Sequence, residues 1–518
     1  MSEREWGSMD ERDFEALLGD SIPELAPEDI IGEVTPWRKA MNRVLTGMAL
    51  CAVTLNFLCL DYILPTIGMV LSLLGFRSLR RENRWFWVCY LITVVRSVYF
   101  FPMLILNTTV FRSAVFSSSA VSAPTIANLL LLIVAFFCLW RALRAVQRKA
   151  GLPPRAGGAV ALIVWYALMY VLTLVQYQGL FIPGAILVAY FLIIRSIYRL
   201  SRELDEAGYS IQAAPVRITD RCIVLAIVLL LAAGGTLGYL FGGSYPMAWR
   251  AVDPSEHAAV EDVKAHLIEL GFPEYVLDDL AAEDIAACEG ALRVVADVTD
   301  EPVNDGRTVT TTEYGGSGHR YIQQRTVYDV KELRITGVGV QLSGERERWI
   351  IFHHFLWTTD PGFYGTESIQ LWPVYRDIRE GWASDGETTG RVLYDKDGKT
   401  MSAPYESIGE QVFTSNSIFW GEQTSTDVFA TFSMPAKGER YRGYVAYPVA
   451  EVQDGYIISS WFNYTHQKSW LQYPALTAME KRMTNGWNDA GVFRTVQDAL
   501  QFYPTEEGIE LINATTTQ

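Results

Sequence analysis

The sequence is poor in cysteine and histidine, and its basic residues are outnumbered by acidic ones. Six cysteines in 518 residues cannot supply a disulfide framework, so the core must come from ordinary apolar burial. The six histidines show neither HExxH nor i, i+4 spacing, so we expect no metal site and no cofactor. The net charge of −15 argues against a nucleic-acid partner.

Catalytic signatures are also missing. The sequence has no Gly-x-Ser-x-Gly motif and no glycine-rich phosphate loop. Cys288, the only cysteine of the C-terminal half, has no neighbouring histidine in the sequence to activate a thiolate, so we interpret it as a small buried residue. The sequence therefore assigns no catalytic residue, and we regard an enzyme as the less favoured class.

Long apolar runs are what the sequence does have. Seven runs predict membrane-spanning helices, near residues 41–60, 62–76, 85–106, 125–145, 157–177, 180–198 and 222–241. The run at 62–76 would form only about 22 Å of helix, against a hydrocarbon core of about 30 Å. The alternative to seven spans is that the first two runs form a shallow hairpin that does not fully cross the membrane. Five spans then remain.

Charge divides the chain into three regions. Residues 1–34 carry a net charge of −9, residues 35–244 carry +13, and residues 245–518 carry −19. A basic and apolar middle between acidic ends is typical of an integral membrane region with cationic flanks. We therefore predict an acidic cytoplasmic segment, a transmembrane bundle and a separate C-terminal domain.

The loop charges predict the orientation. Arginine and lysine gather before the first run and after the second, fourth and sixth runs, whereas the alternate loops are nearly bare of them. Basic loops stay in the cytoplasm. The N-terminus is thus expected in the cytoplasm and the C-terminal domain outside the cell membrane. Because the acidic first 34 residues differ from the basic start of a signal peptide, we expect no cleaved signal.

Two charged residues of the apolar region lie far from the predicted cytoplasmic ends of the runs. Arg96 is in the middle of the third run, roughly 18 Å of helix from Arg84, and Asp61 lies between the first two runs. A lone guanidinium in a bilayer is usually paired or faces a cavity. We hypothesise an Asp61–Arg96 ion pair; the equally weighted alternative is a solvated Asp61 and an Arg96 that reaches the headgroups.

The acidic N-terminal segment contains two short amphipathic stretches. Their apolar residues are Phe14, Leu17 and Leu18, followed by Ile30 and Ile31. The simpler interpretation is a solvated acidic tail, since such stretches are too short to be stable alone. The functional interpretation is that residues 10–34 dock into a groove of a cytoplasmic protein partner. Membrane-bound anti-sigma factors are similar in layout alone.

The C-terminal region predicts an α+β domain with an antiparallel β-sheet and flanking helices. Helices are expected near 256–270, 274–288, 475–485 and 493–502. Strands are expected near 291–299, 320–328, 333–342, 347–358, 368–375, 391–395, 427–434 and 456–464. In the strand from Trp349 to Trp357 both faces are apolar, so it should be central and covered on both sides. Its histidines, His353 and His354, are interpreted as core residues.

Nine of the fifteen tryptophans lie in the C-terminal region. Most should belong to the core, but Trp382 and Trp470 stand in polar, loop-like contexts and are the candidates for stacking on a cell-surface ligand such as a saccharide. The sequence as a whole favours a multi-pass membrane protein whose outer domain senses a ligand or partner and signals to the cytoplasm. The alternatives are an envelope structural or accessory binding protein and an extracytoplasmic hydrolase.

Overall fold

The structure, a computed structural model, describes most of the chain. The described residues are 37–52, 58–112, 115, 122–175, 181–209, 211, 218–304, 307–314, 320–327, 330–377, 381–417, 421–470, 472–485, 491–504 and 509–512. The chain divides into two compact units. The helical unit comprises Met1–Leu106 and Ser113–Thr236, and the β unit comprises Asn107–Arg112 and Leu237–Gln518.

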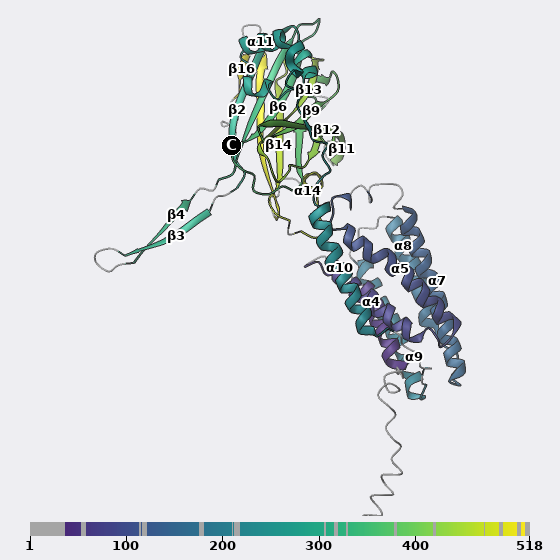
Figure 1. Ribbon diagram of the computed structural model, residues 1–518. Coiled ribbons are helices and arrows are strands. Elements are labelled where there is room, and N and C mark those ends of the chain that lie inside the picture. The colour runs from purple at the N-terminus through teal and green to yellow at the C-terminus, as the bar shows by residue number, and fades with distance from the viewer. Residues whose placement is uncertain are drawn as a thin grey trace, which may run out of the picture. The chain divides into compact units, whose positions relative to one another are not determined.

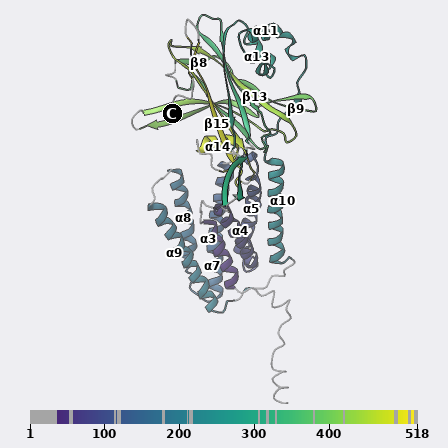
Figure 2. The same cartoon turned by 90° about the vertical axis from the view of Figure 1, so that its left-hand side faces the viewer.

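Each of the seven apolar runs contains a helix in the structure (Figure 1). These helices are α3 (Trp37–Ala52), α4 (Leu60–Leu79), α5 (Arg84–Leu106), α7 (Ser122–Lys149), α8 (Gly157–Leu174), α9 (Phe181–Glu206) and α10 (Asp220–Gly242). Five of the described helices, α4, α5, α7, α9 and α10, are long and apolar enough to cross a membrane. The apolar part of α8 is shorter. Figure 2 shows α8 and α9 side by side.

The short helix is α3 and not α4. The predicted run 62–76 extends to a 20-residue helix, about 30 Å long, whereas α3 has 16 residues. The buried residues of α3, which include Trp37, Met41, Val44 and Met48, follow the helical repeat and lie on one face. A Cβ on Gly75 would lie 2.6 Å from the Cγ2 of Val44, so glycine permits the close approach of α3 and α4.

The β unit contains two antiparallel sheets where the sequence predicted one (Figures 1 and 2). The eight-stranded sheet has the order β1-β10-β9-β13-β6-β5-β2, with β8 also paired to β13. Its strands are β1 (Arg250–Ala251), β2 (Ala291–Pro302), β5 (Glu332–Leu342), β6 (Arg348–Trp357), β8 (Trp382–Ser384), β9 (Thr389–Lys396), β10 (Lys399–Pro404) and β13 (Glu439–Glu451).

The second sheet has six strands in the order β11-β12-β7-β14-β15-β16. They are β7 (Glu367–Trp372), β11 (Ser407–Ser417), β12 (Gly421–Phe432), β14 (Ile458–Gln467), β15 (Phe493–Pro504) and β16 (Ile509–Leu511). A separate hairpin of β3 (Arg307–Tyr314) and β4 (Arg320–Val327) projects away from both sheets (Figure 1). The helix α14 (Ala478–Asn485) lies in the predicted range. The predicted helix at 493–502 is wrong, because these residues form β15.

Strand β6 is covered on both faces, as its sequence predicted. It pairs with β13 on one side and with β5 on the other. Trp349, Ile351 and Phe355 belong to the core between the two sheets. Ile350 and Phe352 belong to a second core, which also contains residues of the helices. Those helices are α11 (Glu261–Glu269), α12 (Glu274–Leu277) and α13 (Ala282–Ala286), and the short 3-10 helix η3 (Glu256–Ala259) precedes them.

Candidate functional site

The intramembrane arginine has a neutral partner. Arg96, on α5, donates from Nε to Oδ1 of Asn128, on α7, at 3.0 Å. The ion pairs of the described residues include none between Asp61 and Arg96. Our sequence argument considered only charged partners and overlooked Asn128, an amide within the fourth apolar run. The structure therefore does not bring the two predicted residues together.

Trp382 is not the exposed platform that its polar sequence context predicted. It is only 4% exposed and belongs to the core between the sheets. The reason is local: Gly381 adopts a φ of +76°, and the chain then enters β8, where Trp382 pairs with Glu451 of β13. Its indole Nε1 is buried, and no residue of the described chain accepts a hydrogen bond from it. Trp382 thus forms part of a cavity wall and keeps an unused donor.

Trp470 is exposed, as predicted. Its side chain is 59% exposed, and its ring lies 5.7 Å from the ring of Tyr239 in an edge-to-face arrangement. The docking residues Phe14, Leu17, Leu18, Ile30 and Ile31 lie outside the described residues.

A cleft of the β unit with a volume of about 440 Å³ lies beside Trp382. One wall comes from the segment after β7 and from β8, and the other from the first half of β12. The lining residues are Tyr375, Arg376, Asp377, Trp382, Ala383, Ser384, Glu422, Gln423, Thr424 and Thr426. The amide of Thr426 donates to the carbonyl of Arg376 at 3.0 Å, which joins the two walls. We call this the Tyr375 cleft.

Arg376 is held in place within the cleft. Its Nε donates to Oδ1 of the buried Asp427 at 2.7 Å, and its guanidinium carbon lies 4.3 Å from the ring centroid of Trp372. The other oxygen of Asp427 accepts from Nε2 of Gln370 at 2.6 Å. Charge-assisted hydrogen bonds and a stacked aromatic face together fix the orientation of a guanidinium. Arg376 therefore presents a preformed polar surface to the cleft.

Tyr375 is fixed by a carboxylate. Its hydroxyl donates to Oε1 of Glu410 at 2.7 Å, and its ring lies edge-to-face against Tyr447 at 5.7 Å. Burial, and next the hydrogen bond to Glu410, raise the pKa of Tyr375 well above its usual value, so the phenol stays protonated. The sequence analysis missed this residue, although the run from Trp372 to Asp377 carries aromatic and charged residues directly after a strand.

The cleft is acidic on balance. Asp377 and Glu422 line it, and Glu410 and Asp427 bond directly to lining residues. Arg376 is the cation among the lining residues. An excess of carboxylates disfavours an anionic ligand by like-charge repulsion. The Tyr375 cleft therefore suits a neutral or cationic polar molecule.

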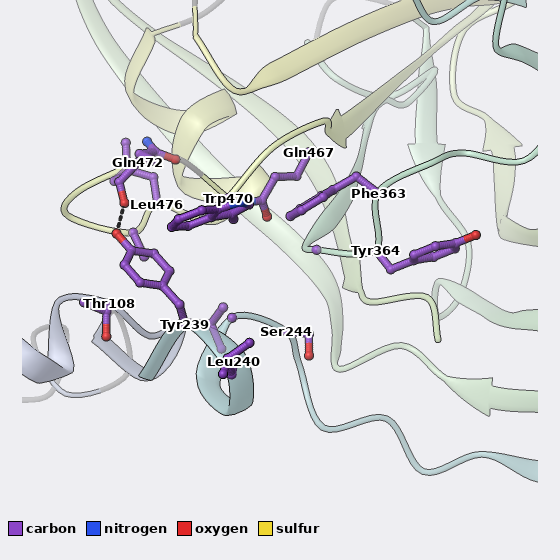
Figure 3. A pocket seen from close by; sticks show the side chains of 14 residues that line it. Thr108, Tyr239, Leu240, Ser244, Phe363, Tyr364, Gln467, Trp470, Gln472 and Leu476 are labelled. Atoms are coloured by element: carbon purple, nitrogen blue, oxygen red, sulfur yellow. Dashed lines mark hydrogen bonds between the residues drawn. The ribbon is translucent and has the colours of Figure 1, made fainter. Parts of the chain in front are cut away.

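A second, smaller cavity of about 120 Å³ contains Trp470 (Figure 3). It is lined by Thr108, Val110, Tyr239, Leu240, Gly243, Ser244, Phe363, Tyr364, Gly365, Gln467, Trp470, Gln472, Ala475 and Leu476. All these residues belong to the β unit, which includes the last turn of α10. In Figure 3 the hydroxyl of Tyr239 points to the backbone carbonyl of Gln472, to which it donates a hydrogen bond.

The histidines of strands β6 and β14 have protein partners. His353 shares a hydrogen bond of 2.7 Å with Oγ of Ser460, and His354 lies 2.9 Å from Oδ2 of Asp279. His466 lies 2.8 Å from Oε1 of Glu367. All three histidines are buried, which agrees with the prediction for His353 and His354. Among the described residues no group of three or more His, Cys, Asp or Glu is arranged to hold a metal ion.

Comparisons with known proteins give no family. No family model matches the chain, and no curated protein matches its sequence. Three solved structures show a weak likeness: a pore-forming protein (6% identity, 40% of this chain, 92% of that one, TM-score 0.16), the Clostridium perfringens delta-toxin (7%, 43%, 100%, 0.16), and the membrane-inserted form of the Clostridium perfringens NetB toxin (6%, 42%, 100%, 0.13). At these TM-scores the likeness supports no conclusion about fold or function.

Proposed function

We propose that this chain is a multi-pass membrane protein whose β unit lies outside the cytoplasm and binds a small polar ligand in the Tyr375 cleft. Five apolar helices of sufficient length support the membrane location. The distribution of loop cations supports a cytoplasmic N-terminus. The other two helices, α3 and α8, are shorter. We propose that they also cross the membrane because of the distribution of loop cations.

The observation that carries the proposal is the preformed Tyr375 cleft. Its volume of about 440 Å³ falls in the range of small-molecule sites. Arg376 and Tyr375 are already held in place by hydrogen bonds to Asp427 and Glu410. Their side chains would therefore lose little conformational entropy when a ligand binds. The unpaired Nε1–H of Trp382 is a buried donor that lacks an acceptor in the described chain.

The lining chemistry supports a saccharide as the ligand class. Gln423, Thr424 and Ser384 supply amide and hydroxyl groups, which match the hydroxyls of a sugar ring. Tyr375 lines the cleft and supplies aromatic surface for the apolar face of such a ring. The acidic balance of the cleft favours neutral or amino sugars over uronic acids.

A cytoplasmic output remains part of the proposal. The acidic residues 10–34 would dock on a protein partner through Phe14, Leu17, Leu18, Ile30 and Ile31. What supports this is composition: amphipathic stretches that lead directly into α3. Cross-linking with mass spectrometry on the native membrane would identify the protein that contacts this segment.

The ligand proposal is tested by binding of neutral, amino and acidic sugars to the purified full-length protein, measured by calorimetry. Glu422→Gln would replace a charge-assisted hydrogen bond by a weaker neutral one, and Thr424→Val would remove a hydrogen bond. Each change should weaken binding of the preferred sugar by roughly fivefold, which corresponds to about 1 kcal/mol. Glu439→Gln, an exposed carboxylate outside the cleft, is the matched control. Binding that is unchanged in both cleft variants, or a panel without any binder, would rule out the cleft as a saccharide site.

A further inference from the structure

The last turn of α10 exposes large apolar side chains. Leu240 is 70% exposed and Phe241 is 79% exposed, and both belong to α10, a helix apolar enough to cross a membrane. The apolar stretch ends at Gly242 and Gly243, after which the chain runs to β1. Exposed leucine and phenylalanine at the end of a spanning helix contact lipid near the boundary of the hydrocarbon core. The last turn of α10, which belongs to the β unit, is therefore expected to lie at the boundary of the hydrocarbon core.

A loop of the β unit is fixed to this same turn. Tyr239 donates its hydroxyl to the carbonyl of Gln472, and its ring contacts the ring of Trp470 at 5.7 Å. A few residues later in the chain, the amide of Ala475 donates to the carbonyl of Asn107 at 2.7 Å. We refer to Lys468, Trp470 and Gln472 as the Trp470 loop. Because the Trp470 loop is hydrogen-bonded to the last turn of α10, the loop should lie at the same depth in the membrane as that turn.

Trp470 differs from the other tryptophans of the β unit. Trp349, Trp357 and Trp382 are buried, whereas Trp470 is the one tryptophan among the exposed large apolar residues of the described part of this unit. The amide of Gln472 donates to the carbonyl of Trp470 at 2.7 Å. Lys468, two residues before it, is also exposed. Tryptophan next to lysine is typical of segments at the membrane–water interface.

We infer that the Trp470 loop is a membrane-contacting element that inserts its indole among the lipid headgroups, beside Leu240 and Phe241. The indole N–H would bond to headgroup or water oxygens while its ring covers acyl chain surface. The ammonium of Lys468 would lie near lipid phosphates. This inference shares with the proposed function only the membrane crossing of α10 and is independent of any ligand in the Tyr375 cleft.

The test places an environment-sensitive NBD fluorophore on single cysteines of the full-length protein in phosphatidylcholine nanodiscs. Trp470→Cys is the test position, Leu240→Cys reports on the end of α10, and Val452→Cys is the matched control. Val452 is apolar and 67% exposed. It directly follows the C-terminal end of β13, where Ala450 pairs with Arg348 at the start of β6. Cys222→Ser removes the exposed native thiol from all three, and that chain without a new cysteine gives the blank.

At position 470 we expect a blue-shifted emission, strong quenching by lipids with a nitroxide near the headgroup, and weaker quenching by nitroxides near the acyl end. At position 452 we expect quenching by aqueous iodide alone. If position 470 is quenched by iodide as strongly as position 452, or by neither reagent, the inference is wrong. If position 240 also escapes quenching by lipid, α10 does not cross and the proposed membrane topology fails with it. Equal melting temperatures of the labelled chains confirm that each is folded.

Discussion

His353 is an ionisable side chain without access to water in the middle of strand β6. It is 1% exposed, its ring stacks on Phe462 at 5.4 Å, and its Nε2 lies 2.7 Å from the hydroxyl of Ser460. Tyr447 donates to the same hydroxyl at 2.6 Å. Burial lowers the pKa of His353 to about 3. The folded protein therefore keeps this ring neutral at neutral and mildly acidic pH.

The stability of the β unit should consequently fall in mild acid. Below pH of about 6.5 the unfolded chain binds a proton on residue 353 that the folded chain excludes until about pH 3. Each pH unit in that window should reduce the free energy of unfolding by up to about 1.4 kcal/mol. His353→Phe removes this contribution, so the gap between variant and wild type should narrow or reverse as pH falls from 7 to 5.

Urea unfolding of the detergent-solubilised protein, followed by tryptophan fluorescence at several pH values, measures this difference. His257→Gln is the control, since His257 is only partly buried and bonds to the carbonyl of Leu280. A parallel loss of stability in wild type and His353→Phe would show that other groups cause the acid sensitivity.

At the residue scale the sequence predicted burial better than exposure. The pattern around His353 and His354 placed both correctly in the core, because alternating apolar neighbours on both faces leave a strand residue nowhere else to lie. Trp382 was misplaced, because its polar sequence neighbours say nothing about β13, which lies about 70 residues later and covers it. The partner of Arg96 was missed for a similar reason: Asn128 lies on another helix, and its distance in the chain hides the contact.

Among the elements, β13 has a feature that the local sequence pattern does not predict, a proline within a strand that has neighbours on both sides. Its sequence contains Pro448, which normally excludes a central strand because proline has no N–H to donate. The structure accommodates this proline where β13 changes neighbours. Ala446 pairs with Thr389 of β9, and Val449 pairs with Ser384 of β8, so Pro448 falls in the gap between the two pairings. Nothing in the local sequence indicates such a gap.

Strand β15 was predicted as a helix because its buried residues imitate a helical repeat. Phe493, Val496 and Leu500 are spaced by three and four residues. In the structure this spacing arises from contacts on both faces of a strand that pairs with β14 from Phe493 to Phe502. Gly337 and Gly339 on β5 leave the room for Leu500 and Phe502 of β15. Tertiary packing overrides the local preference here.

Gly337 should therefore tolerate no side chain. A Cβ there would lie 2.8 Å from Cβ of Leu500, which belongs to the main core and cannot rotate away. Gly337→Ala should lower the free energy of unfolding by about 1–2 kcal/mol, the cost of overpacking less the gain from a stiffer unfolded chain. Gly409→Ala is the matched control, because a Cβ at Gly409 on β11 meets nothing within 4 Å. Thermal melts of both variants decide the matter, and equal melting temperatures would contradict the packing described here.

For the molecule as a whole, the sequence indicated a helical region and a β region because long apolar runs and alternating strands differ so strongly in pattern. The split of the β region into two sheets was not predicted, since strand order depends on pairings between distant segments such as β13 and β6. The contribution of residues 107–112 to the β unit was not predicted either. A six-residue loop between helices carries no sequence signal for the unit it joins.

The orientation of the chain can be tested directly in intact cells. Glu345→Cys, in an exposed loop of the β unit, should react with a membrane-impermeant maleimide, because the loop cations predict that this unit lies outside. Pro154→Cys, between α7 and α8, should react only after the membrane is permeabilised. Gel-shift labelling of each variant in the Cys222→Ser background gives the answer. The reverse pattern would invert the topology and remove the β unit from the cell surface.

The place of β13 in the sheet has a consequence for synthesis of the protein. Because β13 lies between β6 and β9, the eight-stranded sheet cannot close until Glu451 has left the ribosome, roughly 160 residues after the first residue of β2. At typical elongation rates this interval lasts about 8–30 s. Strand β5 already has both of its neighbours, β2 and β6, but the other edge of β6 stays unpaired until β13 is made. An unpaired strand edge of this kind can aggregate with other chains. The nascent β unit should therefore depend on a holding chaperone until β13 has been made, and shortening the interval by circular permutation near β13 should relieve that need.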